Sequence, residues 1–301
     1  MSSIISVQNV SKHYGDYTAV NGINLELKKG CLFGLLGPNG AGKTSLIRMM
    51  TTITAIDEGK ILFNGTPLNS DTPRHIGYMP EERGLYKKMK VGDQLLYLAQ
   101  LKGMSKKEAE EKIMFWMKRF EIEDWWEKEI HELSKGMQQK IQFISTVVHE
   151  PELLILDEPF SGLDPINTNL IKSEIFRLKE NGTTIIFSTH RMEQVEEICE
   201  EIMLVNKGNK VLSGNIQDIR NRYKKNNFEI KTETPVEQIS DIPGTVIEQQ
   251  GNTLTIHMED DNGSNELIKY FLNQGHRIMS FKEILPSLNE IFIQTVESAA
   301  S

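Results

Sequence analysis

A glycine-rich segment between an apolar run and a helical pattern constrains this sequence most. The segment, Gly37–Thr44, has the spacing GxxxxGK[ST]; it follows the apolar run Cys31–Leu36 and leads into the helical pattern Lys43–Thr52. Its glycines let consecutive backbone N–H groups turn inward, and the helix adds the positive end of its dipole. A glycine-rich turn with a surface lysine is the alternative, but strand, loop and helix occur in the order that phosphate binding requires. We therefore predict a nucleoside triphosphate site.

Individual positions of this loop have expected roles. Lys43 brings a full positive charge to the phosphates, so it is both a binding and a candidate catalytic residue. The hydroxyl of Thr44 is placed to bind Mg²⁺. The candidate nucleotide-binding residues of the segment are Gly37, Pro38, Asn39, Gly40, Ala41, Gly42, Lys43, Thr44 and Ser45.

Two adjacent carboxylates follow another apolar run. Leu153–Leu156 is typical of a buried strand, and it is followed by Asp157, Glu158 and Pro159. Ligands of open α/β sheets bind at the carboxyl ends of the strands. Because neighbouring strand residues point in opposite directions, we expect Asp157 to bind the metal ion and Glu158 to act on the attacking water. An acidic turn that only ends a buried strand is the alternative.

Short apolar runs alternate with helical patterns along most of the chain. This alternation indicates an α/β fold whose largely parallel sheet is covered on both faces. The predicted strands are Ile4–Val10, Ile23–Leu27, Cys31–Leu36, Lys60–Phe63, Leu153–Leu156, Thr183–Ser188 and Ile202–Asn206. The predicted helices are Lys43–Thr52, Ile166–Glu180 and Arg191–Glu200, with a mostly helical block at about 92–149.

The pattern changes after Tyr223, where a polar stretch begins. We place a domain boundary there, with a first domain at 1–223 and an accessory domain at 224–301. The second part reads as βαββαβ with a last helix, which predicts a small α+β domain of ferredoxin-like type. Its predicted strands are Phe228–Thr232, Thr245–Gln249, Thr253–His257 and His276–Lys282, and its predicted helices are Pro235–Ser240, Asn265–Asn273 and Ser287–Val296.

Charge and composition narrow the choice of partners and compartment. The chain has 34 Lys and Arg against 42 Asp and Glu, a net charge of −8, which does not favour a nucleic-acid partner. Cys31 and Cys199 lie beside apolar residues, as buried thiols do in a reducing compartment. No window holds the roughly 18 apolar residues of a membrane span. We expect a cytoplasmic protein that needs another chain to cross a membrane.

Three further segments resemble motifs of the ATP-binding cassette (ABC) family. Leu133–Lys140, LSKGMQQK, resembles the LSGGQ signature, with Lys135 and Met137 in place of Gly and Gln. Ser161–Asp164 resembles the D-loop, and His190 matches the switch histidine that senses the γ-phosphate. The resemblance covers about residues 4–220. It implies a P-loop NTPase of ABC type, with a mixed sheet core and a helical subdomain.

The resemblance also implies how two subunits would share ATP. Ser134 and Gly136 of the signature would bind the nucleotide held by a second subunit, in a head-to-tail homodimer or a heterodimer with a paralogue. Tyr14 fits the aromatic residue that stacks on adenine, with Tyr17 as its competitor and simple core packing as the alternative for either. The implied catalytic residues are Lys43, Glu158 and His190.

One position departs from the family pattern. Ile76–Glu81 resembles the loop that ends in glutamine in ABC proteins, and here it ends in Glu81. A carboxylate at this place can still approach the metal ion or its water. Glu81 therefore joins Thr44 and Asp157 as a candidate metal ligand.

The loop at Tyr78–Tyr86, the signature and the C-terminal segment Pro286–Phe292 together resemble exporter ATPases that include bacterial sodium-efflux subunits. This implies an ATP-hydrolysing subunit, peripheral on the cytoplasmic face of the membrane, that drives a separate polytopic permease for sodium, a drug or another substrate. A soluble ABC ATPase that acts as a mechanochemical switch on a macromolecular partner is the alternative. A regulatory role for the C-terminal domain also remains open.

Overall fold

The computed structural model describes residues 2–82, 84–236, 241–259 and 263–298. The chain divides into two compact units between Gly214 and Asn215. Among the described residues, no helix combines the length and the apolar character needed to span a bilayer.

A six-stranded sheet forms the centre of the first unit. Its strand order is β10-β9-β3-β8-β7-β6, and β9, β3, β8, β7 and β6 are parallel neighbours in turn. The bounds are β3 (Leu32–Leu36), β6 (Ile76–Met79), β7 (Leu153–Asp157), β8 (Thr184–Thr189), β9 (Glu201–Asn206) and β10 (Asn209–Asn215). Every residue of β3, β7 and β8 is buried, as expected of strands covered on both faces. The predicted covered parallel sheet is confirmed.

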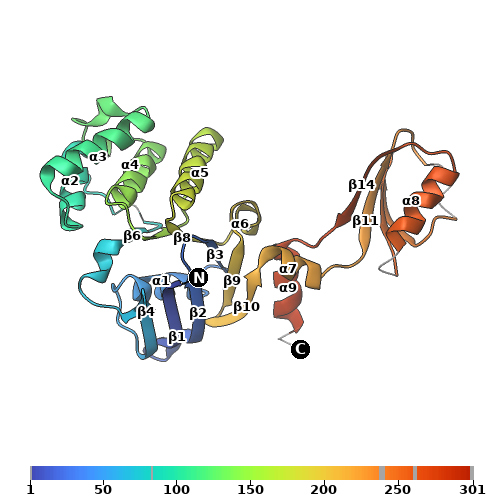
Figure 1. Ribbon diagram of the computed structural model, residues 1–301, viewed down its shortest axis with the longest axis horizontal. Helices are drawn as coiled ribbons and strands as arrows, with labels where there is room; N and C mark the ends of the chain where they lie inside the picture. Colours follow the sequence, from blue (N-terminus) through green and yellow to red (C-terminus); the bar gives the residue numbers. More distant parts are fainter. Residues whose placement is uncertain (1, 83, 237–240, 260–262, 299–301) are drawn as a thin grey trace. The chain divides into compact units, whose positions relative to one another are not determined.

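An antiparallel sheet packs with α1 (Lys43–Met50) against one face of this central sheet (Figure 1). Its order is β2-β1-β4-β5, with β1 (Ser3–Tyr14), β2 (Tyr17–Lys28), β4 (Glu58–Phe63) and β5 (Thr66–Pro67). One apolar cluster joins the layers; it includes Val7 of β1, Leu46 of α1 and Ile155 of β7. The helix that follows the glycine-rich loop is therefore clamped between two sheets.

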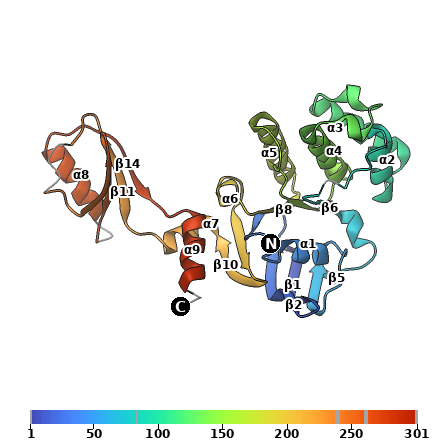
Figure 2. The ribbon, with the colours of Figure 1, turned by 180° about the vertical axis from the view of Figure 1, so that it is seen from behind.

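Helices cover the opposite face of the central sheet, as Figure 2 shows from behind. They are α2 (Val91–Leu101), α3 (Lys106–Arg119), α4 (Lys135–Val147), α5 (Pro165–Glu180) and α6 (Met192–Ile198), with the short 3-10 turns η2 (Glu123–Trp125) and η3 (Ile130–Glu132). A further 3-10 turn, η1 (Thr72–His75), lies beside β4, where His75 contacts Phe63. An aromatic contact between Trp116 of α3 and Phe143 of α4 links two of them, with ring centroids 6.0 Å apart. The helical block predicted at about 92–149 consists mainly of α2, α3 and α4.

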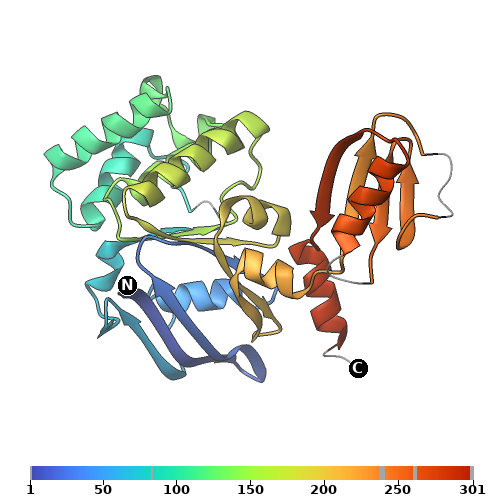
Figure 3. The ribbon, with the colours of Figure 1, turned by 45° about the vertical axis from the view of Figure 1, so that its right-hand side comes forward.

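The second unit carries a four-stranded antiparallel sheet of order β12-β13-β11-β14. Its elements are α7 (Ile216–Arg222), β11 (Asn227–Thr232), β12 (Thr245–Gln250), β13 (Thr253–His257), α8 (Gly263–Asn273), β14 (Ile278–Ile284) and α9 (Leu288–Ser298). Leu267 and Phe271 of α8 pack on Ile230 and other apolar residues of the sheet, and Figure 3 shows the helix lying across it. The strand order is that of the predicted ferredoxin-like arrangement. The predicted helix Pro235–Ser240 lies largely outside the described residues.

Several boundaries differ from those predicted. β6, β10 and α7 were not predicted, and β1 and β2 are longer than their apolar runs because polar residues continue the hairpin as far as the pair Tyr14–Tyr17. β14 begins at Ile278 rather than His276, because the His276 N–H donates to Phe271 O and closes the end of α8.

The unit boundary also falls before the expected one at Tyr223. α7 belongs with the second unit, where the guanidinium of Arg220 donates to the carbonyls of Pro286, at 2.9 Å, and Leu285, at 3.2 Å.

His149, just after α4, makes the stability of the folded chain depend on pH. Its Nε2 lies 3.3 Å from Ile76 O and its ring is largely buried. Burial, with the positive charges of Lys102, Lys112 and His75, lowers the pKa of His149 from 6.5 to about 4. Between these two values the unfolded chain binds a proton that the folded chain does not, so the free energy of unfolding falls as pH falls from 6.5 towards 4.

We predict that His149→Gln reduces this acid sensitivity, because an amide can still donate to Ile76 O but does not titrate. Between neutral pH and about pH 4.5, the free energy of unfolding should fall by about 1 to 3 kcal/mol less in the variant than in the unmodified chain. Urea unfolding followed by tryptophan fluorescence measures this, since Trp116, Trp125 and Trp126 all lie in the helical subdomain. Equal losses in the two proteins would contradict the assignment.

Candidate functional site

The glycine-rich loop connects β3 to α1 and requires glycine at two positions. Gly37 has φ +150°, and Gly42, at the N-terminus of α1, has φ +106°. A Cβ at Gly37 would lie 2.1 Å from Val205 O, and one at Gly42 would lie 2.2 Å from Ala19 O. The backbone of the loop is thus pressed against β9 and β2, with the N-terminus of α1 at the pocket.

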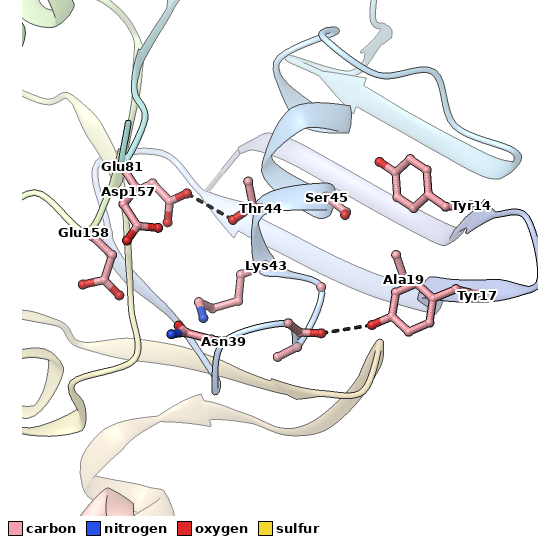
Figure 4. A pocket seen from close by; sticks show the side chains of 13 residues that line it. Tyr14, Tyr17, Ala19, Asn39, Lys43, Thr44, Ser45, Glu81, Asp157 and Glu158 are labelled. Atoms are coloured by element: carbon pink, nitrogen blue, oxygen red, sulfur yellow. Dashed lines mark hydrogen bonds between the residues drawn. The ribbon is translucent and has the colours of Figure 1, made fainter. Parts of the chain in front are cut away.

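This loop forms one wall of a cavity of about 270 Å³, drawn in Figure 4. The sequence predicted all of the lining except Ala19. The lining residues are Tyr14, Tyr17, Ala19, Asn39, Gly40, Ala41, Gly42, Lys43, Thr44, Ser45, Glu81, Asp157 and Glu158. The structure therefore brings the loop from Asn39 to Ser45, the adjacent carboxylates, Glu81 and both candidate adenine-stacking tyrosines to one place, whereas Gly37, Pro38 and His190 are not part of the lining.

Lys43 is the buried cation of this pocket. Its ammonium donates to Gly37 O at 2.6 Å and to Pro38 O at 3.1 Å, and the residue is only 7% exposed. Burial lowers the pKa of Lys43, and the negative charges of Asp157, Glu158 and Glu81 oppose that shift. The charge is held inside the loop, where phosphates would lie.

The carboxylate of Asp157 ends β7 and is 3% exposed. The hydroxyl of Ser188 donates to its Oδ1 at 2.8 Å, and that of Thr44 donates to its Oδ2 at 3.3 Å. Burial raises the pKa of Asp157, and the bond from Ser188 and the charge of Lys43 oppose this. A hydroxyl beside a carboxylate at the edge of a phosphate-binding loop is a donor set that fits Mg²⁺. Thr44 and Asp157 are thus brought together as predicted.

Glu158 lies beyond the end of β7, so strand alternation does not apply to it. Its φ is +51°, a left-handed conformation that a residue with a side chain adopts at a cost in strain. Both carboxylates line one pocket, where Asp157 bonds to Ser188 and Glu158 bonds to Thr189, two consecutive residues of β8. The expectation that Asp157 and Glu158 point in opposite directions stays a prediction.

The side chain of Glu158 is fixed by the end of β8. Thr189 Oγ1 donates to Glu158 Oε2 at 2.9 Å, and the backbone N–H of His190 donates to Oε1 at 2.8 Å. The imidazole Nδ1 of His190 lies 2.6 Å from the same Oε1. The sequence analysis named Glu158 and His190 as catalytic residues but missed Ser188 and Thr189, whose signal is their polarity at the carboxyl end of an apolar strand.

Both tyrosines near the loop remain candidates for stacking on a base. Tyr14 is 47% exposed and Tyr17 is 54% exposed, and both line the pocket. The hydroxyl of Tyr17 donates to Gly40 O at 3.1 Å, which holds its ring beside the loop. Neither ring is a core residue, so the core-packing alternative is wrong for both.

Ser134 and Gly136 lie outside this pocket. Ser134 caps α4, its Oγ accepting from the Met137 N–H at 3.3 Å. A Cβ at Gly136 would lie 3.7 Å from Leu163 of the Ser161–Asp164 segment. The signature residues and this segment are therefore neighbours at the N-terminal end of α4.

Comparison with known proteins agrees with this geometry. Residues 20–161 match the family model described as ABC transporter, and residues 214–296 match the C-terminal domain of DrrA1-3-like ATP-binding proteins. The chain is 45% identical to the uncharacterized ABC transporter ATP-binding protein YhaQ of Bacillus subtilis (strain 168), over 97% of this chain and 98% of that protein. It is 32% identical to the Nod factor export ATP-binding protein I of Rhizobium sp. (strain N33), over 96% of each.

A solved structure described as the ATP-binding subunit of an ABC transporter superposes with a TM-score of 0.69 at 28% identity, covering 73% of this chain and 93% of the other. These likenesses and the pocket formed by the glycine-rich loop, α1 and the end of β7 lead to one conclusion. The chain belongs to the family of ABC transporter ATP-binding proteins, whose members hydrolyse ATP.

Proposed function

We propose that this chain binds ATP with Mg²⁺ and hydrolyses it to drive export through a separate membrane permease. One observation carries the proposal: Lys43 of the glycine-rich loop and the carboxylates of Asp157 and Glu158 line the same pocket. The likeness to a Nod factor export protein along nearly the whole chain supports export. We assign the chemistry to the first domain, with its helical subdomain at about 92–149, and an accessory role to the C-terminal domain.

In this proposal the loop and Lys43 bind the phosphates, and Thr44 and Asp157 hold Mg²⁺. The ion, when bound, neutralises charge that develops on the phosphoryl oxygens. Glu158 orients the attacking water, because Thr189 and His190 fix both of its carboxylate oxygens at the pocket wall. His190, whose Nδ1 contacts Glu158, would sense the terminal phosphate.

Two subunits would share each nucleotide. The N-terminal end of α4, with Ser134 and Gly136, would face the ATP of the other subunit through the positive end of its helix dipole. A homodimer and a heterodimer both satisfy this geometry. Closing and opening of such a pair can move a permease between two access states.

A groove beside the pocket offers a place for the permease. It has a volume of about 220 Å³ and lies between the loop after β6 and helices α2 and α4. Leu98 and Leu101 of α2 and Leu85 of the loop contribute apolar surface, and Leu101 is 60% exposed. We propose that a cytoplasmic segment of the permease docks here, which would place this chain at the cytoplasmic face of the membrane.

Co-purification tests the transporter assignment. The tagged chain, isolated from gently solubilised membranes of its own cell with ATP and Mg²⁺, should bring down a polytopic membrane protein in stoichiometric amount. Recovery with ribosomes or nucleic acid and without a membrane protein would instead favour the mechanochemical alternative.

Replacement of Glu158 by Gln should separate ATP binding from hydrolysis. An amide keeps the size of the side chain but is a poor base, so phosphate release should fall by at least about 100-fold. ATP-dependent dimerisation, measured by light scattering, should persist. Glu180→Gln, at the exposed end of α5, is the matched control. Undiminished hydrolysis in Glu158→Gln would refute the role of Glu158.

Glu81→Gln should retain ATP hydrolysis, because an amide oxygen at this position can still face the metal ion or its water. Titration of the ATPase rate with Mg²⁺ measures this, and Asp157→Asn, which alters a metal ligand directly, should show the larger loss. Near-complete loss of turnover in Glu81→Gln with folding intact would make Glu81 essential and contradict the prediction.

A further inference from the structure

Two glutamines of α4 are buried, although glutamine is usually an exposed residue. Gln139 and Gln142 are each 3% exposed. They are three positions apart in the helix, so they lie on one face of it. Burial of an amide is unfavourable unless it is hydrogen-bonded, so the partners of these side chains indicate what their burial achieves.

Each glutamine donates to the carbonyl of a proline next to an acidic residue of the pocket. Gln139 Nε2 lies 2.9 Å from Pro159 O, directly after Glu158. Gln142 Nε2 lies 2.8 Å from Pro80 O, in the peptide unit that leads into Glu81. Because the ring of proline fixes φ, the position of each carbonyl constrains the adjoining backbone. One helix face thus holds the main chain of two neighbouring loops of the nucleotide pocket, those after β6 and β7.

Ser134 and Gly136 of the signature lie at the N-terminal end of the same helix. α4 begins directly after Ser134, and Gly136 lies in its first turn. An α-helix of this length is stiff, since it rises 1.5 Å per residue with every turn hydrogen-bonded. Contact at its first turn can therefore shift the second and third turns, where Gln139 and Gln142 reach the two loops.

We propose that Gln139 and Gln142 are positioning residues that couple the two nucleotide sites of the dimer. Engagement of the partner's ATP at the start of α4 places the chain's own Glu158 and Glu81 through these two amide-to-carbonyl bonds. The inference rests on the proposed function, since it requires a shared nucleotide between subunits. Neither glutamine lines the nucleotide pocket, so their effect acts through the loops that they hold.

Near-isosteric replacement tests the two bonds. Gln139→Met and Gln142→Met keep an unbranched side chain but remove the donor. Thr146→Val is the matched control: Thr146 is 5% exposed on the same helix, and its hydroxyl donates within the helix, to Gln142 O at 2.8 Å. In the full-length chain, each Met variant should lower kcat by about tenfold relative to the control, because small misplacements of catalytic groups are costly. ATP affinity and melting temperature should match the control.

A double-mutant cycle with Ser134→Ala separates coupling from simple destabilisation. If the signature acts on Glu158 through Gln139, then Gln139→Met should lower kcat by less than about twofold in the Ser134→Ala background. The coupling would be overturned if the fold-losses of kcat of the two single variants simply multiply in the double variant, or if the Met variants have the same kcat as Thr146→Val. ATP hydrolysis by the unmodified chain would still uphold the proposed function in either case. Failure of the unmodified chain to hydrolyse ATP would overturn both.

Discussion

The site depends on keeping one buried ammonium among carboxylates at the carboxyl edge of a parallel sheet. Lys43 is nearly inaccessible to water, and burial alone would favour its neutral form. The negative charges of Asp157, Glu158 and Glu81 offset that tendency, while Lys43 in turn opposes the rise in the pKa of Asp157. Each sign of charge favours the ionised form of the other, and the triphosphate chemistry proposed for this pocket uses both.

This arrangement of charges is possible because rigid elements deliver each group. Lys43 sits in the first turn of a helix clamped between two sheets, and Asp157 ends a fully buried strand. Glu81 and Glu158 lie in loops that follow β6 and β7, and Glu158 has a left-handed backbone conformation. That strain persists because Thr189 and His190 hold the side chain of Glu158, and the backbone N–H of Glu158 donates to Ser188 O at 2.9 Å. Two consecutive carboxylates with separate partners on β8 thus line one pocket.

Most of the fold and pocket could be predicted because they depend on local signals. The apolar runs predict the buried strands, and the glycine spacing predicts a loop whose backbone admits no side chain at Gly37 or Gly42. The sequence could not show the conformation of Glu158, because neighbours on β8 impose it. It also gave no sign of α7, whose partners at Leu285 and Pro286 lie far along the chain.

The hydrogen bonds from α4 belong to the same class of features hidden from sequence patterns. Periodicity places Gln139 and Gln142 on one helix face, but only the fold reveals that this face meets the carbonyls of Pro159 and Pro80. An apolar side chain would pack there at a smaller desolvation cost, and it would leave both loops without that hydrogen bond. Burial of two amides is therefore better explained by control of backbone position than by packing. In the proposed dimer, α4 would face the partner's nucleotide at its first turn and hold the loops of its own site through these amides.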